Sequence, residues 1–234
     1  MGVKTVIILN QQSPILHFQH QQQGATLRAS EVKPKLDRFI KEKIAGLPEA
    51  TEAEKKIKQE LYKAENFVAV KKEDLQTNSF DAYALNYKLR FENISRSDIC
   101  EPADIYYGNM KLSDAEKTKT VFCSSVRMTL ICFNSALLSY IEKHIEEFFV
   151  VTNFGRMQNK GFGSFTVAEI NGEPTKRMSH DEIALCLKKA FGAKVCYAFD
   201  VTDTTNSRTN AFSKIKTLYS VINGWRKRSF FVFI

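Results

Sequence analysis

The amino-acid sequence predicts an α+β fold, in which an antiparallel sheet carries helices on one face. The first observation is the order of periodic segments over residues 3–170, which is strand, helix, strand, strand, helix, strand. The second is the regular alternation of apolar and polar residues in Tyr83–Phe91, which is typical of a strand with one wet face. The third is that 44% of the 234 residues are hydrophobic, which is enough to bury a core.

The first two elements are a strand and a long helix. The apolar run Val3–Leu9 fits a buried strand. Thr26–Ile44 is predicted to be helical, with Ser30 as its N-cap, because apolar residues recur at spacings of three and four. These residues are Val32, Leu36, Phe39 and Ile40.

A charged segment, Glu49–Glu65, interrupts the main pattern. It contains oppositely charged pairs four residues apart, which favour an exposed helix: Glu52/Lys56 and Glu54/Lys58. We expect residues 49–75 to form a helical insertion at the surface, with its charges solvated.

The remaining elements complete the pattern. Phe122–Phe133 is predicted as the strand after Tyr83–Phe91, and Ser135–Phe149 as an amphipathic helix. Phe162–Ile170 is the closing strand, and the Asn-Gly pair at 171–172 marks a turn after it. The resulting βαββαβ order is that of the ferredoxin-like (RRM-like) fold.

Residues 1–175 are therefore predicted to form the main domain, and residues 176–234 an α/β extension or a partial second unit. A capping box of Ser179 and Glu182 predicts a helix that ends at Phe191. A strand over Lys194–Asp200 and a helix over Phe212–Ile222 are expected after it.

Charge and cysteine content restrict the class of protein. The formal net charge is +8, which favours a polyanion or an acidic surface as partner. The five cysteines are odd in number and none has C-x-x-C spacing, which argues against a disulfide framework and a zinc ribbon. No run reaches membrane-spanning length and no signal peptide is evident, so we expect a cytoplasmic protein without a membrane partner, metal or cofactor.

A glycine-rich segment, Gly155–Phe165, joins the second predicted helix to the closing strand. It holds three glycines together with the cations Arg156 and Lys160. Its backbone N–H groups and these cations suit a phosphate-bearing partner. A tight helix-to-strand connection with solvated cations is the alternative, and on this segment alone it is the favoured one.

The start of the first helix is a second candidate phosphate site. A helix N-terminus offers free N–H groups and partial positive charge. Arg28, Ser30 and Lys33 lie where they could add donors, although an ordinary capped helix explains them equally well. The two segments need not lie side by side in this fold, but a long nucleic acid could span both.

Together the two segments resemble the RAMP superfamily of CRISPR-associated proteins. Leu27–Phe39 resembles the family pattern L-R-x-S-x-K-x-x-x-R-F, except for Pro34, where the family usually has glycine after the lysine. Gly155–Ser164 resembles the pattern G-x-x-x-x-K/R-G-F-G-S. The chain is most similar to a Cmr-type subunit of type III effector complexes.

The resemblance implies an antiviral, RNA-binding subunit that holds single-stranded guide or target RNA beside other effector subunits. It implies that the RNA phosphates are held by two cationic segments and the glycine backbone: Arg28, Ser30, Lys33, Arg156, Lys160, Gly161, Phe162 and Gly163. Such contacts set affinity and register, and they carry no sequence information.

The resemblance also raises the possibility of catalysis. Some relatives cut precursor CRISPR RNA without metal, using histidine as general acid–base, and His17 and His20 follow the first strand where such a base could lie. Asp37 faces a lysine-rich side of its helix, so an ion pair is expected for it rather than a role in cleavage. Three hypotheses therefore remain: an RNA-binding subunit, a metal-independent endoribonuclease, and a ferredoxin-like interaction domain that binds no RNA.

Overall fold

A computed structural model describes residues 3–16, 26–69, 83–95, 97–100 and 120–192 of the chain. The strand predicted at Lys194–Asp200, the helix predicted at Phe212–Ile222, and the candidate bases His17 and His20 lie outside the described residues.

The main sheet confirms the predicted topology. Its strand order is β4 (Tyr87–Asn93), β7 (Ser125–Cys132), β1 (Val3–Gln11), β8 (Phe165–Ile170) and β9 (Glu173–Pro174). All neighbouring strands in this order are antiparallel. Strand β1 therefore lies between β7 and β8, with β4 beyond β7, which is the arrangement of the ferredoxin-like fold.

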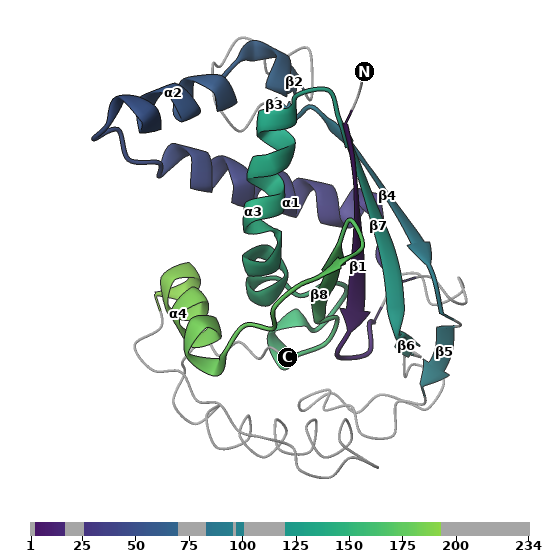
Figure 1. Cartoon of the computed structure of the whole chain (residues 1–234). Coiled ribbons are helices and arrows are strands. Elements are labelled where there is room, and N and C mark those ends of the chain that lie inside the picture. Colours follow the sequence, from purple (N-terminus) through teal and green to yellow (C-terminus); the bar gives the residue numbers. More distant parts are fainter. Residues whose placement is uncertain (1–2, 17–25, 70–82, 96, 101–119, 193–234) are drawn as a thin grey trace.

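Two helices, α1 (Ala29–Ala45) and α3 (Ser135–Val151), lie on the same side of the sheet (Figure 1). The core forms between them and the inner residues of the strands, such as Ile7 and Leu9, which are fully buried. Aromatic rings fill the end of this core where α3 leads into the last strand: Phe148, Phe149, Phe154 and Phe165.

The two middle strands of the prediction are each divided in the structure. β3 (Tyr83–Leu85) pairs with β2 (Phe67–Ala69), and β6 (Thr120–Cys123) pairs with β5 (Ser97–Cys100), so both leave the main sheet. At Asn86 the backbone N–H donates to the Asn66 carbonyl at 2.8 Å, and the side chain donates to Glu65. The alternation of side chains continues through this break, which is why the sequence shows one strand.

The predicted helical insertion contains α2 (Glu52–Leu61). Thr51 caps it through a capping box with Glu54, and none of its six charged residues is buried: three are exposed and three are partly exposed. Leu61, at its end, is 1% exposed and belongs to the main core. The insertion is therefore attached to the domain by buried apolar contact.

The prediction of Ser30 as the N-cap of α1 is wrong. Arg28 is the N-cap, without a side-chain hydrogen bond to the helix, and its carbonyl accepts from the N–H groups of Glu31 and Val32. Leu27 is buried just before it, which fixes where the chain turns into the helix. Ser30 lies in the first turn, with its side chain exposed.

Helix α4 (His180–Phe191) begins at the predicted capping box of Ser179 and Glu182, which is confirmed. Its residue Ile183 is buried against Val150 and Val151 at the end of α3. The predicted turn before it is also confirmed, since Asn171 and Gly172 both have positive φ. The domain boundary at residue 175 remains a prediction.

Candidate nucleic-acid interface

The structure places the start of α1 beside the glycine-rich segment. The backbone N–H of Gly155 donates to the Glu31 carboxylate at 2.6 Å. Lys35 Nζ, one turn further along α1, donates to the Asn153 carbonyl at 3.0 Å. The topology explains this adjacency, because β1 and β8 are antiparallel neighbours and the end of one meets the start of the other. The two segments predicted to bind phosphate therefore form one continuous surface.

The residues just after β1 form hydrogen bonds with the glycine-rich segment. The Leu16 carbonyl accepts the N–H of Arg156 at 2.7 Å, and the Pro14 carbonyl accepts that of Gly163 at 2.9 Å. The hydroxyl of Ser13, which is fully buried, donates to the Gly161 carbonyl and accepts the N–H of Ser164. These long-range bonds hold the glycine-rich segment in one conformation.

Two of the glycines are required by packing. Gly155 has φ +78°, and a Cβ there would lie 2.4 Å from the Leu16 carbonyl oxygen. Gly163 has φ +70°, and a Cβ there would lie 1.9 Å from the Phe154 carbonyl oxygen. Both positions thus need a left-handed backbone and have no room for a side chain.

The backbone expected to hold phosphate is occupied within the protein. The N–H of Gly161 donates to the Gln158 carbonyl at 3.2 Å, and that of Gly163 donates to Pro14 as described above. Phe162 is 2% exposed, so its ring is part of the core. These three residues therefore shape the segment, and the predicted use of the Gly161 and Gly163 N–H groups as phosphate donors does not agree with their internal hydrogen bonds.

Two arginines flank the junction between α1 and the segment. Arg28 is the partly exposed N-cap residue one turn before Glu31, and Arg156 is exposed immediately after Gly155. Lys160 ends a 3₁₀ turn that begins at Gln158. Since the N-terminus of α1 adds partial positive charge here, the surface is suited to an anion.

Lys35 is a residue that the sequence analysis missed. Its ammonium group lies 3.5 Å from Glu31 and 4.9 Å from the centre of the Phe154 ring. Burial lowers its pKa, against the opposing effect of Glu31. The Glu31/Lys35 spacing of four residues was the available signal. The opposite charges of Glu31 and Lys35 offset each other, and the hydrogen bonds of both residues join α1 to the start of the glycine-rich segment.

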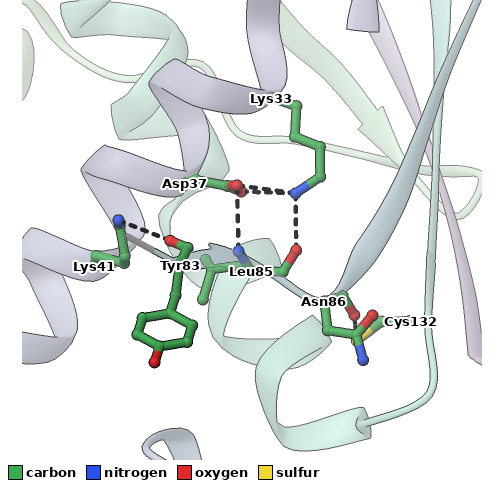
Figure 2. Close-up of polar contacts among 7 residues, drawn as sticks. All are labelled: Lys33, Asp37, Lys41, Tyr83, Leu85, Asn86 and Cys132. Atoms are coloured by element: carbon green, nitrogen blue, oxygen red, sulfur yellow. Dashed lines mark hydrogen bonds and ion pairs between the residues drawn. The ribbon is translucent and has the colours of Figure 1, made fainter. Parts of the chain in front are cut away.

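Lys33 points away from this surface toward β3 (Figure 2). Its ammonium group pairs with Asp37 at 2.9 Å, donates to the Leu85 carbonyl at 2.8 Å, and lies 4.0 Å from the centre of the Tyr87 ring. The ion pair expected for Asp37 is confirmed. Burial, assisted by the Asp37 charge, raises the pKa of Tyr87 well above its usual value.

The histidines of the described residues lie on α3 and α4. His144 lies on α3, 3.7 Å from Glu147, and burial lowers its pKa. His180 is the first residue of α4. Within the described ranges, no group of three or more His, Cys, Asp or Glu side chains is arranged to hold a metal ion. In the same ranges, none of the helices has the length and apolar character needed to cross a membrane.

Comparison with known proteins identifies the family of this chain. The family model described as the Cmr1 N-terminal domain matches residues 2–224. The chain belongs to this family. The resemblance to Cmr-type members of the RAMP superfamily is thereby confirmed.

The fold of this Cmr1 family member is similar to that of a solved relative. A crystal structure of Cmr1 from Pyrococcus furiosus in its apo form matches with a TM-score of 0.52 and 11% identity, covering 96% of this chain and 77% of that chain. A cryo-EM structure of the type III-B Cmr-beta complex bound to cognate target RNA matches with a TM-score of 0.42 and 12% identity, covering 73% of this chain. The match spans 60% of the chain in that complex. No curated protein matches the chain.

Proposed function

We propose that this Cmr1 family member is an RNA-binding subunit of a type III CRISPR effector complex. It contacts the phosphates of single-stranded guide or target RNA through Arg28, Ser30, Arg156 and Lys160. The observation that carries the proposal is the 2.6 Å hydrogen bond from the Gly155 N–H to Glu31, which joins the two motifs of the family into one surface.

The electrostatics of this surface support an anionic ligand. The Glu31 carboxylate is engaged by Lys35 and by the Gly155 N–H, so its charge is offset locally. Arg28 and Arg156 lie on either side of that junction, at the positive end of the α1 dipole. The overall charge of +8 adds long-range attraction for a polyanion.

The remaining candidate residues have a supporting role in this proposal. Gly161, Phe162 and Gly163 fix the shape of the segment, while Lys33 holds α1 against β3. Side-chain contacts to phosphate place the RNA without reading its bases. Other effector subunits would then supply the complementary guide contacts, which makes them the expected protein partners.

The test is fluorescence anisotropy with a labelled single-stranded RNA over a range of salt concentrations. For Arg28→Ala combined with Arg156→Ala and Lys160→Ala, we expect weaker binding and a salt slope that is smaller by about 0.7 for each phosphate that is no longer neutralised. The matched control is Arg38→Ala combined with Lys143→Ala and Lys189→Ala, which removes the same charge from exposed positions on α1, α3 and α4. Equal effects of the control and the triple variant would contradict the proposed site, and absence of RNA binding by the wild type would contradict the function.

A further inference from the structure

The face of the sheet opposite to the helices carries a cationic surface that the proposed site does not include. In the part of the chain that the structure describes, α1, α3 and α4 all lie on the other side (Figure 1). The outward residues of β4, β7 and β1 form cross-strand rows, because paired residues in neighbouring strands share a face.

Three such rows follow from the register. The first is Lys4, Ile131 and Lys88; the second is Val6, Thr129 and Arg90; the third is Ile8, Arg127 and Glu92. In the third row Arg127 and Glu92 form an ion pair at 3.2 Å. The first two rows contain three cations and no acidic residue.

The cations of the first two rows have no acidic partner among the described residues. Lys4, Lys88 and Arg90 are exposed, and none of them forms an ion pair within the described ranges. Residues two apart on a strand are about 7 Å apart, and residues two strands apart are about 10 Å apart. Three cations this close repel one another weakly in water, and a polyanion would relieve that repulsion.

An exposed aromatic residue lies just beyond the end of β7. Phe133 is 77% exposed in a bend directly after β7, two residues after Ile131 of this face. Ile131, between the two lysines, is itself 40% exposed. An aromatic ring beside cations is the combination with which proteins hold single-stranded nucleic acids.

We propose that this surface, formed by Lys4, Lys88, Arg90 and Phe133, is a second contact for single-stranded RNA. The cations bind phosphates and Phe133 stacks on one base. The centre of the face carries Val6 and Thr129 rather than aromatic rings, so the contact is independent of sequence. An acidic protein surface could also pair with the cations, but it would not explain the exposed Phe133 ring.

The second surface and the proposed site lie at opposite ends of β1. Lys4 is near the start of the strand, whereas Ser13, just after its end, is bonded to the glycine-rich segment. An RNA that follows β1 could reach both. The inference rests on the proposed function, because it extends the path of the same RNA.

The experiment compares two triple variants by anisotropy with labelled oligouridine over a range of salt. The test variant is Lys4→Gln with Lys88→Gln and Arg90→Gln. The control is Lys143→Gln with Lys188→Gln and Lys189→Gln, which removes the same charge from exposed positions on α3 and α4. We expect the salt slope of the test variant to be smaller by about 0.7 for each phosphate that it no longer binds, and that of the control to stay close to the wild type.

Two single variants test the stacking contact. Phe133→Ala and Phe133→Leu both keep the fold, because the ring is exposed, and we expect each to weaken binding by about tenfold since neither has a π-face. If Phe133→Leu binds RNA like the wild type, stacking is excluded. If the two triple variants lower the salt slope of RNA binding equally, or if neither lowers it, RNA does not bind at the second surface. The second of these results is the one expected if this face binds an acidic protein.

The outcomes separate this inference from the proposed function. Wild-type binding that responds to the Arg28, Arg156 and Lys160 variant alone overturns the second surface and leaves the proposed site intact. If only the substitutions of Lys4, Lys88 and Arg90 weaken RNA binding, the second surface is supported and the site in the proposed function is contradicted. Absence of wild-type RNA binding overturns both.

Discussion

Gly163 shows how much a single residue contributes to the glycine-rich segment. Its N–H bonds to Pro14, its carbonyl accepts from the Phe154 N–H, and its α-carbon faces the Phe154 backbone so closely that no Cβ fits. The glycine at this position is therefore required by packing, independently of any ligand. This matters for interpretation, because weaker RNA binding by a Gly163 variant would not identify a contact.

Substitution of Gly163 by alanine should destabilise the protein strongly. The Cβ would clash with backbone atoms and the left-handed φ would be strained, so we expect a loss of at least about 3 kcal/mol in the free energy of unfolding. The melting temperature should fall by about 6–12 °C, measured by circular dichroism. Gly172→Ala is the control, because its φ is also positive but its Cβ would meet no atom within 4 Å. Equal losses in both variants would show that the close contact is unimportant.

At the scale of elements, α1 acts on β3 as a neighbouring strand would. Lys33, Asp37 and Lys41 lie four residues apart on one side of α1 and face the backbone of Tyr83 and Leu85 (Figure 2). Lys33 and Lys41 donate to the carbonyls of Leu85 and Tyr83, and Asp37 accepts the Leu85 N–H at 3.2 Å. Because alternate residues of a strand present their backbone groups to the same edge, this side-chain ladder satisfies the edge that β2 does not cover.

Removal of the central member should loosen β3 selectively. Asp37→Ala leaves the Leu85 N–H without its acceptor and Lys33 without its ion pair, so we expect a loss of about 2 kcal/mol in stability. Hydrogen exchange should then show faster exchange of the Leu85 amide, with little change at the main-sheet amides of β1. Asp37→Asn keeps an acceptor for that amide and should be milder. Uniform loss of protection over the whole sheet in Asp37→Ala would contradict a local ladder.

At the scale of the whole molecule, the two proposed RNA surfaces are separated by the length of one strand. The nine residues of β1 span about 30 Å, which corresponds to about nine stacked nucleotides at 3.4 Å each. The helices occupy the remaining face, so an RNA that contacts both surfaces has to pass along the sheet rather than across the helices.

RNA length should therefore decide how many surfaces take part. For an oligouridine of about four nucleotides, shorter than the span of β1, we expect only one set of cations to matter at a time. For one of about fifteen nucleotides, the effects of the Arg28 and Arg156 substitutions and of the Lys4, Lys88 and Arg90 substitutions on the salt slope should add, because the sites are far apart. The measurement is the salt slope at each length. Equal slopes for the two lengths would argue against a continuous path.

The sequence by itself determined the order of the main elements, the capping box of α4 and the family, because these are recorded in local periodicity and short motifs. It also located the glycine-rich segment and the pairing of Asp37. The amphipathic period of α3 and the capping pair of Ser179 and Glu182 depend only on neighbours within about one helical turn, so they can be recognised without the fold.

Only the tertiary structure decided which of the candidate residues lie on the surface of the proposed site. Lys33 and Arg28 are five residues apart in the chain, yet Lys33 is held by Leu85, while Arg28 lies at the junction with residue 155. The division of the first middle strand at Asn86 and the contact of Glu31 with Gly155 likewise depend on partners distant in sequence. The physical reason is that a hydrogen bond or a steric limit between such partners leaves no periodic trace, since it exists only once the sheet has brought them together.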